Sequence, residues 1–113
     1  MFNKPILEQF LSSFERERQS ILLKAYVESF EKHIKISEEA LTKEDSKTLL
    51  MEVHDLKSLS LIVGDLETGA LAGSIESNLK NQNIQLAYND IPALFEAIKS
   101  ILKIMRQYEH ITL

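Results

Sequence analysis

Apolar residues recur every three or four positions along most of this chain, which is the spacing of one face of an α-helix. The longest of these stripes begins after Ser20 and continues to Leu41, with glutamates and lysines between its members. A shorter stripe over residues 6–14 predicts a brief leading helix. We expect that helix to pack as a lid over one end of the structure.

Capping residues divide the middle of the chain into two further helices. Asp45 is the predicted N-cap of a third helix, because its side chain can accept hydrogen bonds from the free amides of a first turn. That helix should run to about Gly64, which supplies a stop. Asp65 is then a suitable cap for a fourth helix that ends near Asn81.

The polar residues 81–83 predict a loop of roughly ten residues before the last helix. Asp90 followed by Pro92 predicts the start of that helix, since a proline in the first turn lacks only an amide that needs no partner. The pattern therefore predicts an all-α fold, an up-and-down antiparallel four-helix bundle with a short extra N-terminal helix. We expect residues 1–113 to form a single domain.

Composition excludes several classes of function. The chain has no Cys, so thiol nucleophiles, disulfides and cysteine metal sites are excluded, and three Gly with two Pro are too few for a fold with many tight turns. A net charge of −4 argues against a nucleic-acid partner. No apolar run is long enough to span a membrane, and the first residues do not resemble a signal peptide. We therefore expect a soluble cytoplasmic protein.

One histidine has neighbours that suggest chemistry. On the third helix, Leu49, Val53, Leu56 and Val63 fall within about 80° of one another and predict the buried face. His54 lies roughly 100° from the centre of that face, so its imidazole should be open to water.

The same outward face carries further candidates. Lys57 and Ser58 follow His54 by three and four residues, and we expect Leu50 and Leu61 to point outward beside them. Exposed leucines around an ionisable group suggest a docking surface. A His with a Lys three residues later is by itself more often an ordinary pair of surface residues.

The longer context is more specific, because residues 53–64 read VHDLKSLSLIVG and are followed by DLETGALAGSIE. This segment resembles the signature of the histidine-containing phosphotransfer (HPt) domain family. The residues at the family's offsets are His54, Lys57, Ser58, Ser60 and Gly64, with Ile75-Glu76 at a later pair that completes the pattern of the next helix. The resemblance extends over about residues 6–109.

The resemblance implies a phosphorelay intermediate in two-component signalling. His54 would accept a phosphoryl group from an aspartyl phosphate of a receiver domain and pass it to another receiver or back. Lys57 would stabilise the phosphoryl charge, Ser58 would add a hydrogen bond, and Gly64 would be structural. Leu50 and Leu61 would contact the partner.

No cofactor is expected on this chain, since magnesium would belong to the receiver. The sequence has no phosphate-binding loop or kinase-like glycine pattern, so we expect neither ATP binding nor autophosphorylation. Whether such a phosphocarrier should be called an enzyme is left open. The partners implied are receiver domains of hybrid histidine kinases or response regulators, with the protein itself a monomer.

Departures from the family pattern keep an alternative open. Ser58 stands where the family usually has Gly, Leu59 and Leu61 are bulkier than usual, and Thr68 replaces a more common Leu. The alternative is a non-catalytic bundle that binds and sequesters a response regulator or other partner. A self-associating structural bundle is a weaker third interpretation.

The remaining candidates carry less weight. We expect His33 to be a surface residue and assign no role to His110. The chain has neither an H-E-x-x-H nor an E-x-x-H motif, so no metal site is predicted. Gly69 and Gly73 lie four residues apart, and close packing of two helices explains them better than a dimerisation face.

Overall fold

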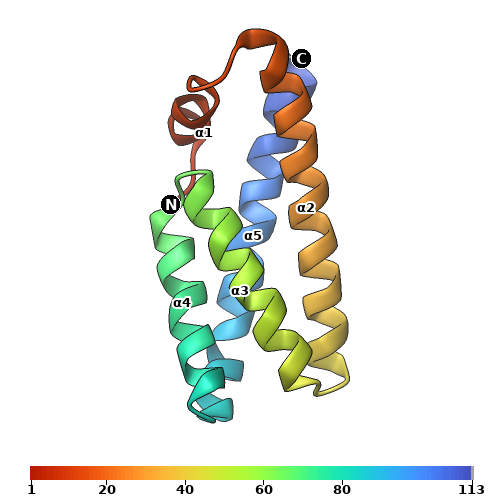
Figure 1. Cartoon of the computed structure of the whole chain (residues 1–113), viewed down its shortest axis with the longest axis vertical. Helices are drawn as coiled ribbons and strands as arrows, with labels where there is room; N and C mark the ends of the chain where they lie inside the picture. Colours follow the sequence, from red (N-terminus) through yellow and green to blue (C-terminus); the bar gives the residue numbers. More distant parts are fainter. Residues whose placement is uncertain (113) are drawn as a thin grey trace.

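A computed structural model describes residues 1–112 as helices joined by short turns (Figure 1). In chain order the helices are α1 (Lys4–Leu11), α2 (Arg16–Thr42), α3 (Ser46–Ile62), α4 (Leu66–Lys80) and α5 (Ile84–Thr112). Residues 1–112 contain no strand. The predicted all-α fold with a short N-terminal helix is therefore confirmed.

The four long helices form an antiparallel bundle. Each packs against the next one in the chain, and α2 also packs against α5, which closes the ring (Figure 1). The predicted buried face of α3 is correct, because Leu49, Val53, Leu56 and Val63 are all fully buried. The molecule is a rod with extents of 44 × 22 × 18 Å. Within the described residues, no helix is both long and apolar enough to cross a membrane.

The three turns of the bundle share one construction. Each has a residue with positive φ just after a helix, namely Glu44 (55°), Gly64 (95°) and Gln82 (61°). The next residue then donates its amide back to a carbonyl five positions earlier, as in Asp65 N to Ser60 O at 2.9 Å. This confirms that Gly64 ends α3, because a left-handed conformation costs glycine little.

The predicted caps of α3 and α4 are also correct. The Asp45 carboxylate accepts the amide of Thr48, and the Asp65 carboxylate accepts the amide of Thr68. The Thr68 hydroxyl donates to the second Asp65 oxygen at 2.6 Å, so this buried pair satisfies its own polar atoms. Thr68, unusual for the resembled family, thus belongs to the cap of α4.

The predicted loop of roughly ten residues before α5 is wrong. The turn occupies residues 81–83, and α5 begins at Ile84, so Asp90 and Pro92 lie inside the helix and do not start it. Ala87 and Ile91 are fully buried and extend the apolar stripe of α5 toward its beginning. Burial of that stripe therefore outweighs the local start signal of Asp90 and Pro92 and the backbone hydrogen bond that Pro92 cannot donate.

Helix α2 extends beyond its apolar stripe. It begins at Arg16, and the five residues before Ile21 are all polar. Helix α1 has the predicted position over one end of the bundle. Its Leu7 and Leu11 are buried, and Ile6 lies against Gly64 at the α3–α4 turn.

The lid has a geometric cause. Helices α2 and α5, with 27 and 29 residues, are longer than α3 and α4, with 17 and 15 residues. At about 1.5 Å per residue, the helices of the long pair are on average roughly 18 Å longer than those of the short pair. Helix α1 covers apolar surface on that overhang, beside the turn between α3 and α4 (Figure 1).

Candidate functional site

His54 lies at the middle of α3 with its side chain 55% exposed, as the helical spacing predicts. Its backbone is fixed by a buried neighbour on each side, Val53 and Leu56, which turn the imidazole away from the core. The ring therefore stands on a rigid helix and faces solvent.

The imidazole is oriented by a carboxylate from the adjacent helix. Nδ1 of His54 lies 2.6 Å from Oε2 of Glu76 on α4. A carboxylate can only accept, so Nδ1 carries the hydrogen and donates it. In the neutral ring Nε2 then holds the lone pair, and no described side chain hydrogen-bonds to it. The arrangement selects one nitrogen as the nucleophile.

Glu76 is nearly buried, with its side chain only 6% exposed, and is nevertheless ionised. Burial alone would raise the pKa of the carboxyl group. Hydrogen bonds from Lys57 and His54, with the charges of Lys57 and Lys80, outweigh burial and lower that pKa from 4.5 to about 2. The carboxylate therefore stays charged and accepting at neutral pH.

Two lysines share this carboxylate with the imidazole. Lys57 Nζ donates to Oε1 of Glu76 at 2.5 Å, and Lys80 Nζ lies 3.4 Å from Oε2. Lys57 is 28% exposed and Lys80 is 60% exposed. The predicted pairing of His54 with Lys57 is therefore mediated by a third residue on another helix.

The sequence analysis places Glu76 in the family pattern but predicts no chemical role for it. The helical spacing of α4 nevertheless indicates that Glu76 needs a charged partner. Glu76 follows Ala72 by four residues and precedes Leu79 by three, so it lies on the buried side of α4. A charged residue on an apolar face requires a partner of opposite charge.

Two of the other predicted site residues, Ser58 and Leu50, occupy less open positions than expected. The Ser58 hydroxyl donates to the backbone carbonyl of His54 at 3.2 Å, so it has an acceptor on its own helix. Leu50 is half-buried, which corrects its predicted outward orientation, whereas Leu61 is 44% exposed. Met51 and Ile62, which the sequence analysis did not select, are more exposed than Leu61.

Helices α3 and α4 approach closely because of two glycines. A Cβ on Gly69 would lie 2.3 Å from Cδ2 of Leu61, and a Cβ on Gly73 would lie 3.5 Å from Cδ of Lys57. This supports the interpretation of the glycines as helix-packing residues. The short separation is what allows Glu76 to reach α3.

His33 is not a surface residue, contrary to the prediction. Its side chain is only 17% exposed, and Nδ1 lies 2.5 Å from Oε2 of Glu52. The charged side chains on α2 had suggested a solvated position, but the partner comes from α3 and could not be identified from spacing. His110 lies outside the residues whose side chains are described.

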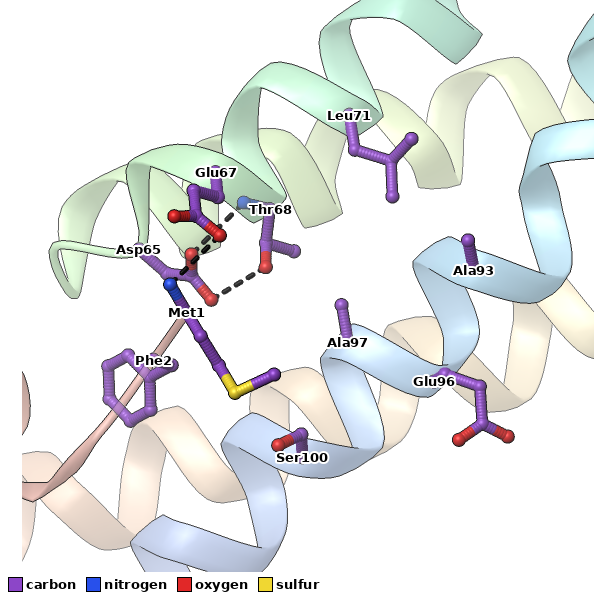
Figure 2. A pocket seen from close by; sticks show the side chains of 10 residues that line it. All are labelled: Met1, Phe2, Asp65, Glu67, Thr68, Leu71, Ala93, Glu96, Ala97 and Ser100. Carbon is purple, nitrogen blue, oxygen red and sulfur yellow. Dashed lines mark hydrogen bonds and ion pairs between the residues drawn. The ribbon is translucent and has the colours of Figure 1, made fainter.

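Two cavities among the described residues lie away from the imidazole. One, of about 560 Å³, lies between the start of α4 and the middle of α5 (Figure 2). Its walls include Phe2, Leu71 and Ala97, and the Met1 ammonium pairs with Glu67 at its rim. A second hollow of about 580 Å³ lies where α3 begins and α4 ends, lined in part by Leu50 and Lys80. Through Lys80, this second hollow adjoins the Glu76 cluster.

An exposed imidazole with Nδ1 bound to a buried carboxylate and Nε2 open to solvent is suited to act as a nucleophile. The family model of the Hpt domain matches residues 21–107, so the chain belongs to the Hpt domain family. Such domains take part in phosphotransfer in two-component signalling and interact with receiver domains. Searches of the curated proteins and of the solved structures each gave no match.

Proposed function

We propose that this Hpt domain is a phosphorelay intermediate that accepts a phosphoryl group on His54 from the aspartyl phosphate of a receiver domain. It then passes the group to a second receiver or returns it. The observation that carries this proposal is the hydrogen bond from Nδ1 of His54 to Glu76, which leaves Nε2 as the free nucleophile on an exposed ring. The protein supplies the acceptor, and the receiver supplies the magnesium.

In the proposed step, the Nε2 lone pair attacks phosphorus and forms an N–P bond. The O–P bond to the receiver aspartate breaks, and its electron pair stays on the carboxylate oxygen. The imidazole gains positive charge and keeps its hydrogen on Nδ1, where the Glu76 carboxylate offsets that charge. Phosphoryl transfer depends chiefly on positioning and charge stabilisation, and this cluster provides both.

Lys57 is the residue that would stabilise the transferred group. Its Nζ already lies on the His54 side of α4, where it is bound to Glu76. A phosphoryl group on Nε2 would compete with Glu76 for that ammonium group. Lys80 would remain as a cation for Glu76, so the carboxylate would not be left unpaired. Ser58 would have to release the His54 carbonyl before its hydroxyl could reach the phosphoryl oxygens.

The docking surface that we propose surrounds His54 along α3. Its exposed apolar members are Leu61, Met51 and Ile62, with half-buried Leu50 beside the hollow at the start of the helix. Lys47 and Lys80 line that hollow, so it suits the acidic rim of a receiver's aspartate pocket.

The test is transfer from a panel of phosphorylated receiver domains to the purified protein. We expect acid-labile label on the wild type and complete loss of label in His54→Gln, with helicity unchanged. His33→Gln is the matched control, because it removes the other described imidazole without touching the His54 site. Label that persists in His54→Gln would contradict the proposal.

The alternative is a bundle that sequesters a receiver without accepting phosphate, and Ser58 at the position of the family's glycine favours it. A side chain there reduces the space available for a partner's active site. The same assay separates the two functions. Binding that survives His54→Gln, together with no transfer to the wild type, would establish sequestration.

A further inference from the structure

A second cluster of ionisable groups lies between α2 and α3, away from Glu76. It contains His33 from α2 with Glu52 and Asp55 from α3, and one ligand atom from each lies within 4.8 Å of the other two. Nδ1 of His33 is 2.5 Å from Oε2 of Glu52 and 3.7 Å from Oδ2 of Asp55. Two carboxylates therefore converge on a single imidazole nitrogen.

The charges of this cluster are not balanced by the protein. Among the described side chains, His33 is the one ion-pair partner of both Glu52 and Asp55. Glu52 is only 12% exposed, so solvent screens its charge poorly. A proton on His33 would balance one of the two negative charges, whereas a divalent cation would balance both.

We infer that His33, Glu52 and Asp55 form a binding site for a divalent transition-metal ion of the zinc class. One imidazole nitrogen with two carboxylate oxygens suits Zn²⁺ or Co²⁺ better than Mg²⁺ or Ca²⁺, which prefer oxygen ligands alone. Sequence motifs could not reveal this site, because its ligands come from two helices.

The distances are compatible with such an ion. Zinc binds nitrogen and oxygen at about 2.0–2.2 Å, so ligands of a tetrahedral ion lie roughly 3.4 Å apart. The Glu52 contact must open and the Asp55 contact must close, both by less than about 1 Å. Asp55 is 48% exposed and its side chain can make this movement. The exposed side leaves room for water at the remaining coordination position.

Occupation of the site would add metal–ligand bonds between two helices that packing and the His33–Glu52 contact already join. Glu52 and Asp55 lie three residues apart on α3, on either side of His54 in sequence, and His33 belongs to α2. The ion would therefore stabilise the helix that presents the imidazole. This inference is independent of the proposed phosphotransfer, which requires no metal on this chain.

The test is a titration of the full chain, freed of metal by chelation, with Zn²⁺ and Co²⁺. Calorimetry should give one ion per chain, the visible spectrum of Co²⁺ should report nitrogen–oxygen coordination, and Zn²⁺ should raise Tm. Asp55→Asn should weaken binding at least roughly tenfold, which is the loss seen even when outer partners of a metal are removed. Mg²⁺ at the same concentration should shift Tm much less.

His54→Gln is the matched control, because His54 and Glu76 form another nitrogen–carboxylate pair. It should bind Zn²⁺ with the affinity of the wild type. Glu52→Gln provides a second ligand variant if Asp55→Asn changes the helicity. Absence of binding to the wild type overturns the inference. Equal affinity of the wild type and the ligand variants, or loss of binding in His54→Gln alone, overturns it as well.

Discussion

Glu76 is the residue on which the geometry of the candidate site depends most. It receives hydrogen bonds from His54 and Lys57 and lies near Lys80, although its own side chain is nearly buried. Such a carboxylate affects both stability and reactivity. The pH dependence of stability therefore tests whether Glu76 is ionised in the folded protein.

We predict that Glu76 contributes stability that acid removes. Its pKa is about 2 in the folded protein against an ordinary value of 4.5, so between these pH values the unfolded chain binds more protons. The contribution is therefore complete above pH 4.5 and is lost as the pH falls toward 2. We expect about 1–2 kcal/mol, because Lys80 and the imidazole are partly screened by solvent.

The measurement is the free energy of unfolding by urea at several pH values between 7 and 2.5, for the wild type and for Glu76→Gln. Glutamine keeps the size of the side chain and cannot ionise. The difference between the two proteins should shrink as the pH falls through this window. A constant difference would show that the carboxylate is not selectively ionised in the folded state.

At the residue scale, the sequence predicts the part of the site that lies on one helix and misses the contacts between helices. The exposure of His54 and the nearness of Lys57 follow from positions on one helix, which periodicity describes well. The contact to Glu76 joins residues 22 positions apart, so it depends on how two helices pack. The same limit explains the error at His33, whose partner Glu52 belongs to another helix.

At the scale of the elements, the close packing of α3 against α4 involves two glycines, and a side chain would have more room at one than at the other. We predict that Gly73→Ala stabilises the protein by about 0.5–1 kcal/mol, because alanine favours helix and its Cβ would meet Lys57 at an ordinary 3.5 Å. Gly69→Ala should instead destabilise by roughly 1–2 kcal/mol, since Leu61 must move away.

The free energies of unfolding of Gly69→Ala and Gly73→Ala, measured by heat or urea, test these two predictions. Each variant is the control for the other. Leu61→Ala combined with Gly69→Ala should cost less than the sum of the two single changes, because the clash is then absent. Equal effects of Gly69→Ala and Gly73→Ala would contradict the packing that we describe.

The helix boundaries show where local signals succeed and fail. Asp45, Gly64 and Asp65 were identified correctly because each acts through its own backbone or the next turn. The start of α5 was missed because Gln82 adopts a positive φ that sequence assigns to glycine. Pro92 then suggested a helix start, although buried residues on both sides of it hold one continuous helix.

At the scale of the whole molecule, α1 contributes to stability and lies apart from the candidate site. We predict that Leu7→Ala destabilises the protein by about 2–5 kcal/mol, as expected for a fully buried leucine. The rate of phosphotransfer should not change at temperatures where the variant stays folded, since α1 covers the end of the bundle and His54 lies at the middle of α3.

Denaturation curves and transfer rates measured on the same preparation check this separation, with exposed Gln9→Ala on the same helix as the control. A slower transfer by folded Leu7→Ala would mean that α1 takes part in receiver docking.

The close approach at Gly69 has a consequence for rate as well as for packing. Gly69 and Glu76 are two helical turns apart on the same side of α4, so a wedge at the glycine also changes the reach of the carboxylate. The spacing between α3 and α4 should therefore affect how well Glu76 orients the His54 imidazole. Substitutions of increasing size at Gly69 should change the rate of the proposed phosphotransfer, although the residues proposed to contact the phosphoryl group are themselves unchanged.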